Sequence, residues 1–118
     1  MDILLTNNPL VKELCQGEFE LYFTDTDIHE ILTQVRDFIH KGHRLLTHPL
    51  SGSVKPNETL YKSVLITDKM DEIDFKSVGI IEDCIQTVQK FPQKQIPDEY
   101  RNDMQIVDLS LIRSALEK

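Results

Sequence analysis

The chain contains no tryptophan, only two cysteines and no long run of apolar residues. A helix that crosses a membrane needs about 20 consecutive apolar residues, and no segment of this sequence approaches that length. The first residues, Met1–Asp2–Ile3, also lack the basic region of a secretory signal peptide. These absences predict a protein that is neither inserted into a membrane nor exported, and we expect it in the cytoplasm.

The cysteines and histidines do not form a metal-binding pattern. Cys15 and Cys84 are far apart and no C-x-x-C pair occurs, although structural zinc sites need closely spaced ligands. Both cysteines lie among apolar residues, which favours buried thiols in a reducing compartment, and a redox role is the alternative. No cysteine or paired carboxylate near His40, His43 and His48 completes a metal site. We expect neither a metal nor a cofactor.

Positive charge is scarce in this sequence. The 118 residues include 13 Lys+Arg against 20 Asp+Glu, which gives a formal net charge of −7. Binding of nucleic acid depends on a positive surface that releases counterions from phosphates, so the charge balance argues against a nucleic-acid partner. The chain is 40% hydrophobic, and a protein of this length buries roughly two-thirds of its unfolded surface, which is enough for one core. We expect a single domain over residues 1–118.

Short apolar runs and alternating polar–apolar runs predict five strands. The fifth strand competes with a single helix that begins at Pro97 and continues through the same residues. No helix is visible between the third and fourth strands, so the sequence leaves open whether they run parallel or antiparallel. The predicted strands are Ile3–Thr6, Glu18–Phe23, Arg44–Thr47, Ser63–Thr67 and Met104–Val107.

Capping residues mark the beginnings of four helices between and after these strands. Asn8 is followed by Pro9, a favourable first helical residue, and Asp27 is followed three residues later by Glu30, which forms a capping box. The alternation predicts an α/β fold, a three-layer sandwich with a mainly parallel, Rossmann-like sheet of four or five strands and helices on both faces. The predicted helix starts are Asn8, Asp27, Asp74 and Asp108, and the predicted stops are Gly17, Gly42 and Pro92.

Polar residues gather where the predicted strands end, and ligands of open α/β sheets bind at the carboxyl ends of strands. The loop that follows the third strand is longer than most connections, and long loops are often functional. Its Ser51–Gly52–Ser53 turn could direct N–H groups and hydroxyls toward an anion, although the sequence has no P-loop motif. Helix caps and solvated turns are the alternative roles. The candidate ligand-binding residues are Asn7, Asn8, Thr47, His48, Ser51, Gly52, Ser53, Lys55, Asn57, Tyr61 and Lys62.

The segment from Arg36 to Lys62 is basic within an acidic chain. It holds five basic and two acidic residues, a net charge of +3, whereas the remaining residues carry −10. A local positive region attracts small anions and acidic partners, and chance clustering on a solvated surface is the alternative. His48 ends a predicted strand beside the long loop, and histidine has an ordinary pKa of about 6.5. It is therefore the best candidate for a catalytic general base.

One long stretch resembles a known family. The residues from Val35 to Thr59, VRDFIHKGHRLLTHPLSGSVKPNET, resemble the signature of the GrdX family, as do Thr6–Asn7–Asn8–Pro9 and Tyr61–Lys62–Ser63. These small proteins are named for the glycine reductase gene clusters of amino-acid-fermenting anaerobic bacteria. The resemblance implies a cytoplasmic protein connected with glycine, sarcosine or betaine reductase, and it assigns no catalytic or binding residue.

Three functional hypotheses follow from these patterns. The leading one is an accessory or regulatory protein of the reductase system that binds a small anion or an acidic partner at the loop of residues 48–63. The second is a small enzyme of phosphate or acyl-phosphate chemistry that uses His48. The third is an interaction protein whose loop orders on a partner, such as a component of the reductase complex. A homodimer is compatible with each of them.

Overall fold

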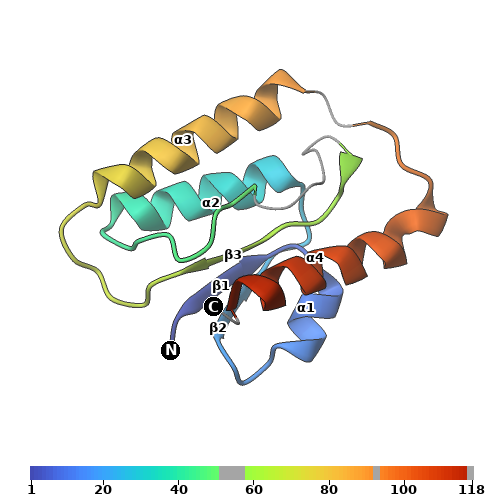
Figure 1. The fold of residues 1–118 in the computed structure, drawn as a ribbon, viewed down its shortest axis with the longest axis horizontal. Helices are drawn as coiled ribbons and strands as arrows, with labels where there is room; N and C mark the ends of the chain where they lie inside the picture. Colours follow the sequence, from blue (N-terminus) through green and yellow to red (C-terminus); the bar gives the residue numbers. More distant parts are fainter. Residues whose placement is uncertain (51–57, 92–93, 117–118) are drawn as a thin grey trace.

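The computed structural model describes residues 1–50, 58–91 and 94–116. In this part of the chain a three-stranded sheet lies between α2 and α3 on one face and α1 and α4 on the other (Figure 1). The strands are β1 (Ile3–Thr6), β2 (Glu20–Phe23) and β3 (Ser63–Ile66). The helices are α1 (Pro9–Leu14), α2 (Ile28–His40), α3 (Phe75–Lys90), the short 3-10 helix η2 (Asp98–Tyr100) and α4 (Arg101–Leu116).

The sheet has the order β2-β1-β3 and is mixed. β1 pairs in parallel with β2, with Leu4 opposite Leu21, and antiparallel with β3, with Leu4 opposite Leu65. The prediction of a mainly parallel, Rossmann-like sheet of four or five strands is therefore wrong. The antiparallel β3 has a consequence for the site, because its first residue lies at the same edge of the sheet as the last residue of β1.

Two predicted strands are not strands in the structure. Residues 44–47 form only an isolated bridge, Leu45 to Ile66, because the N–H groups of Leu46 and Thr47 both donate to the carbonyl oxygen of Leu65 and so cannot continue a ladder. Residues 104–107 lie inside α4. The competing prediction of one helix after Pro97 is the one that the structure supports, so Asp108 is an interior residue of α4 and does not cap a helix.

The alternation of β1 distributes its side chains between two cores. Ile3 and Leu5 pack with residues of α2 and α3, whereas Leu4 packs with α1 and α4. Val35 of α2 and Ile112 of α4 are among the buried residues of the first and second core, respectively. The predicted three-layer arrangement with helices on both faces is confirmed.

The predicted helix starts are correct at three of the four positions. The side chain of Asn8 accepts a hydrogen bond from the N–H of Leu10, that of Asp27 from Glu30, and that of Asp74 from Ser77. The predicted stops are also close. Gly42 follows the C-cap of α2 with φ +110°, and α3 ends before residue 92. Gly17, with φ +84°, lies two residues after Cys15, the C-cap of α1.

Within the described ranges, none of the helices combines the length and the apolar character that a membrane crossing requires.

Candidate functional site

Buried polar side chains gather at one end of the strands, where the last residue of β1 pairs with the first residue of β3. β1 ends there, β3 begins there, and α4 passes beside both strands (Figure 1). Each of these side chains is at most 7% exposed, although polar residues at strand ends are usually solvated. We call this group the edge cluster, and it consists of Thr6, Asn7, Asn8, Lys62, Ser63 and Asp108.

Asp108 is the acceptor at the centre of the edge cluster. Its Oδ2 accepts from the Ser63 hydroxyl at 2.7 Å and from Nδ2 of Asn8 at 3.0 Å, and its Oδ1 accepts from the Ser63 N–H at 3.1 Å. Ser63 Oγ also lies 2.7 Å from Thr6 Oγ1. A carboxylate that accepts several hydrogen bonds can remain in a buried position. This network joins α4 to both strands.

The two asparagines fix the backbone around the cluster. Asn7 Nδ2 donates to the carbonyl oxygens of Thr26 and Leu60, each at 2.8 Å, and its Oδ1 accepts from the Lys62 N–H at 2.9 Å. Asn8 caps α1 and also donates to the Gln105 carbonyl oxygen at 2.9 Å. Both side chains therefore hold neighbouring segments in place, which leaves little hydrogen-bonding capacity of Asn7 for a ligand.

Lys62 is the buried cation of the cluster, with 4% exposure. It lines a recess of about 10 Å³ together with Pro49, Ser63, Asp108, Leu111 and Ile112. Burial lowers the pKa of the Lys62 ammonium, and the negative charge of Asp108 opposes that change. Burial raises the pKa of the Asp108 carboxyl, against the hydrogen bonds from Asn8 and Ser63 and the charge of Lys62. Buried groups with pKa values shifted toward neutrality are frequent at functional sites.

The structure brings together some of the predicted site residues and separates others. Asn7, Asn8 and Lys62 belong to the edge cluster, and Tyr61 is beside it, where its hydroxyl accepts from Nε2 of Gln105 at 3.1 Å. Thr47 precedes β3 in the chain and is buried beside it, where its hydroxyl oxygen accepts a hydrogen bond from the N–H of Leu65 in β3. The remaining predicted residues in the loop, Ser51, Gly52, Ser53, Lys55 and Asn57, lie outside the described residues.

His48 is exposed, and its ring forms a hydrogen bond with the backbone two residues later. Its Nδ1 accepts a hydrogen bond from the Leu50 N–H at 3.1 Å. The next residue, Pro49, lines the recess beside Lys62, so the backbone of His48 is adjacent to the site. The geometry leaves the Nε2 atom as the ring nitrogen for any chemical role.

Asp108 and Ser63 are the functional candidates that the sequence pattern missed. Asp108 lies four residues from Met104 and four from Ile112, so a helix through residues 104–112 places an acidic residue within an apolar stripe. That is a detectable signal for a buried carboxylate. Interpretation of residues 104–107 as a strand concealed it, because an aspartate that follows a strand resembles a helix cap.

Three other cations of the basic segment that the structure describes face α3, its N-cap or an aromatic ring. Arg36 lies 4.0 Å from a carboxylate oxygen of Glu82, and Arg44 lies 3.7 Å from one of Asp74. Lys41 is 5.7 Å from the ring centroid of Phe38. The charges of Arg36 and Arg44 are therefore partly balanced by acidic residues outside the basic segment.

Comparison with known proteins gives one result. A model of the GrdX-like protein family matches residues 3–117, nearly the whole chain, which confirms the resemblance seen in the sequence. No curated protein and no solved structure matches the chain significantly.

Proposed function

We propose that the chain, which belongs to the GrdX-like protein family, is an accessory or regulatory protein of the glycine reductase system that binds a small oxyanion at Lys62. The family name suggests an association with glycine reductase gene clusters. The proposed site is the recess at the edge cluster, where β1 ends, β3 begins and α4 passes. The ligand class is a carboxylate or a phosphate, and the protein need not transform it.

The observation that carries this proposal is the burial of Lys62 in a recess. Removing an ammonium group from water is costly, and the negative charge of Asp108 favours the charged form of Lys62, so a charged group of each sign lines the recess. A recess of about 10 Å³ has room for roughly one water-sized atom. One oxygen of a carboxylate or phosphate fits such a space, and its negative charge would favour the protonated form of Lys62.

Asp108 sets the pH dependence of the proposed binding. Its carboxylate lines the same recess and would repel an incoming anion, whereas its protonated form would not. Because burial raises the pKa of Asp108, protonation occurs closer to neutral pH than for an ordinary aspartate. We therefore expect the affinity for an oxyanion to increase as the pH falls toward the pKa of Asp108, as long as the protein remains folded.

A thermal-shift series tests the site. Inorganic phosphate, acetyl phosphate, acetate and glycine are each added to the wild type, to Lys62→Met and to Lys69→Met. Lys69 is an exposed lysine after β3 and serves as the matched control. We expect at least one oxyanion to raise the melting temperature of the wild type and of Lys69→Met, and to have no effect on Lys62→Met. Equal shifts in all three proteins, or no shift in any of them, would contradict binding at Lys62.

Hydrogen exchange tests the association with the reductase. Purified components of glycine reductase are added one at a time, and amide exchange is compared at the edge cluster and at the surface of α2. We expect one component to slow exchange around Lys62 and Ser63 more than at α2. The association is refuted if every component leaves the exchange rates of the whole chain unchanged.

A further inference from the structure

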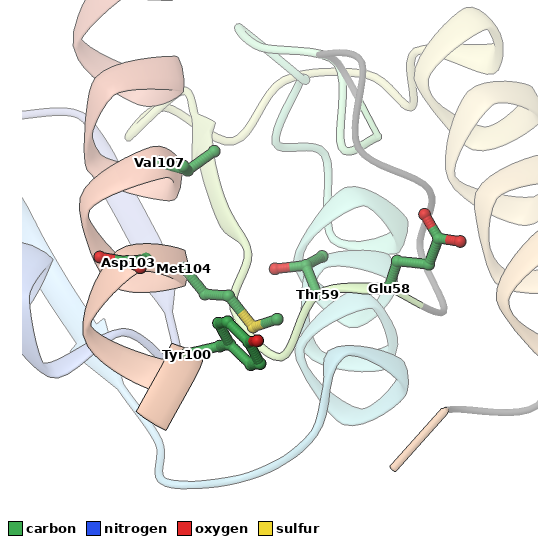
Figure 2. A pocket seen from close by; sticks show the side chains of 6 residues that line it. All are labelled: Glu58, Thr59, Tyr100, Asp103, Met104 and Val107. Carbon is green, nitrogen blue, oxygen red and sulfur yellow. The ribbon is translucent and has the colours of Figure 1, made fainter. Parts of the chain in front are cut away.

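An apolar hollow lies along α4, separate from the recess at Lys62. It has a volume of about 200 Å³ and is open to solvent, and residues of η2 and α4 face the segment before β3 across it (Figure 2). Figure 2 shows the ring of Tyr100 and the thioether of Met104 on one side and Thr59 on the other. Its lining residues are Glu58, Thr59, Tyr100, Asp103, Met104 and Val107.

The α4 side of the hollow is a stripe of large apolar residues. Tyr100, Met104 and Val107 are spaced four and three residues apart, so they share one face of the helical segment. Tyr100 is 50% exposed and Val107 is 44% exposed. Such a stripe normally packs against another element. Met104 borders the core-facing side of α4, which carries Asp108 and Ile112, so Tyr100 and Val107 are the part of the stripe that the core does not cover.

Asp103 supplies a negative charge beside this hollow, and Figure 2 shows its carboxylate on the side of α4 turned away from Thr59. Glu58 on the opposite side pairs with Lys94 at 2.8 Å, and Asp98 pairs with Arg101 at 2.8 Å. Asp103 makes no ion pair with any residue that the structure describes. The surface therefore combines an apolar hollow with the Asp103 carboxylate beside it, which is complementary to an apolar group that carries a neighbouring positive charge.

We propose that the hollow binds an apolar side chain of a partner polypeptide, next to a lysine or arginine of that partner that pairs with Asp103. This inference is independent of oxyanion binding at Lys62, because it rests on a different cavity and on charge of the opposite sign. It identifies an interaction surface on α4 and the chemistry of the segment that the surface recognises.

The dimensions favour a side chain of a polypeptide over a free small molecule. Pockets for small molecules are usually about 300–1,000 Å³, whereas one buried apolar anchor is typical of a protein interface. At 100° per residue, Asp103 lies between Val107 and Ile106 around α4. Ile106 is 54% exposed, so a polypeptide that reaches Asp103 also covers Ile106, which a molecule confined to the hollow does not.

The charge of the chain argues against a second copy as the occupant. The net charge is −7, and contact between two copies at this surface would bring their Glu99 and Asp103 carboxylates together. Like charges at an interface oppose association. A basic partner would instead form favourable charge interactions with the same carboxylates.

An NMR titration tests the proposal. The methyl signal of Met104 is followed while the capped peptide Gly-Lys-Leu-Lys-Gly is added at low salt to the wild-type protein. Two peptides serve as controls, Gly-Glu-Leu-Glu-Gly with reversed charge and Gly-Lys-Ser-Lys-Gly without the apolar anchor. A fourth probe, 3-methylbutylamine, presents the same apolar group and a positive charge without a polypeptide.

We expect a saturable shift with the lysine–leucine peptide and weaker binding of the other three probes. Asp103→Asn should weaken binding up to about fivefold, the range of an exposed ion pair, whereas the exposed control Asp25→Asn should not. Met104→Gln, read on the amide signals of α4, should abolish the binding, whereas Met70→Gln, at a methionine that is 65% exposed elsewhere, should leave it unchanged.

Four results would overturn the proposal. They are the absence of a saturable shift, equal binding of the glutamate-flanked or serine peptide, binding of 3-methylbutylamine as tight as that of the peptide, and a Met104 signal that changes with protein concentration alone. The third result would indicate a small-molecule site, and the fourth would indicate a second copy of the chain. Failure here leaves the thermal-shift test of Lys62 unaffected, because that test uses other residues.

Discussion

Replacement of Asp108 by alanine tests whether the edge cluster holds the fold together. The substitution removes the acceptor of three hydrogen bonds, from the Ser63 hydroxyl, the Ser63 N–H and Asn8. The Ser63 hydroxyl keeps Thr6 and Asn8 keeps the Gln105 carbonyl oxygen, but the Ser63 N–H loses its bond to Asp108 without replacement. An unsatisfied buried N–H costs about 1–3 kcal/mol, and each lost hydrogen bond about 0.5–1.5 kcal/mol.

The expected loss in the free energy of unfolding is about 3 kcal/mol. Loss of one partner of a buried charge pair usually costs about 3–5 kcal/mol, and the low end applies because burial already penalises the Asp108 carboxylate. Urea unfolding followed by far-UV circular dichroism measures the difference, since the chain has no tryptophan for fluorescence. Asp103→Ala, on the exposed side of the same helix, is the control and should change the stability by less than about 0.5 kcal/mol.

The pH dependence of this loss provides a second check. A raised pKa means that the folded state holds the Asp108 proton more tightly than the unfolded state. This group therefore contributes most to stability below its unfolded pKa, and the contribution decreases as the pH rises through the folded pKa. The difference between the wild type and Asp108→Ala should be larger at acidic pH than at pH 7. A loss below about 1 kcal/mol, or a difference that grows toward pH 7, would refute the reasoning.

Three further predictions concern other positions. Asn7→Ala leaves two carbonyl oxygens and one N–H without their partner, so urea unfolding should show a loss of about 2–4 kcal/mol, and a loss below about 1 kcal/mol would contradict the proposed role of Asn7. Gly42 has φ +110°, and an added Cβ would collide with the backbone oxygen of Asp71. Gly42→Ala should therefore lower the melting temperature more than Gly17→Ala, which has φ +84° and open space around it; equal decreases would disprove this. Burial raises the pKa of the Cys84 thiol to about 11, so at pH 8 Cys84 should react with DTNB more than tenfold faster in urea than in the folded protein. Equal rates in the two states would contradict the burial of this thiol.

Local signals predicted most of the elements because they depend on few residues. The Asn8, Asp27 and Asp74 caps are where the sequence places them, since a capping hydrogen bond joins residues two or three apart. The errors have a different physical origin. Residues 44–47 and 104–107 are short apolar runs, and a short run fits a strand, a buried turn or one side of a helix equally well.

The candidate site was predictable only in part, because its geometry depends on contacts between distant segments. Asn7 and Lys62 are 55 residues apart along the chain, and Ser63 and Asp108 are 45 apart. The antiparallel direction of β3 brings them to one edge, and no periodicity in the sequence specifies that direction. The basic segment was likewise predicted from its charge, but only the fold shows that Arg36 faces a carboxylate of α3 and Arg44 the carboxylate of its N-cap, Asp74.

The most direct test of oxyanion binding is to observe Lys62 itself. Phosphate and acetate are titrated into ¹⁵N-labelled protein at constant ionic strength, and the backbone amides of Lys62, Ser63 and Asp108 are followed by NMR. We predict a saturable shift of these signals with at least one of the two anions, tighter at lower pH and lost in Lys62→Met. Signals that do not move, or that move equally in Lys62→Met, would contradict the claim that this buried lysine binds an anion.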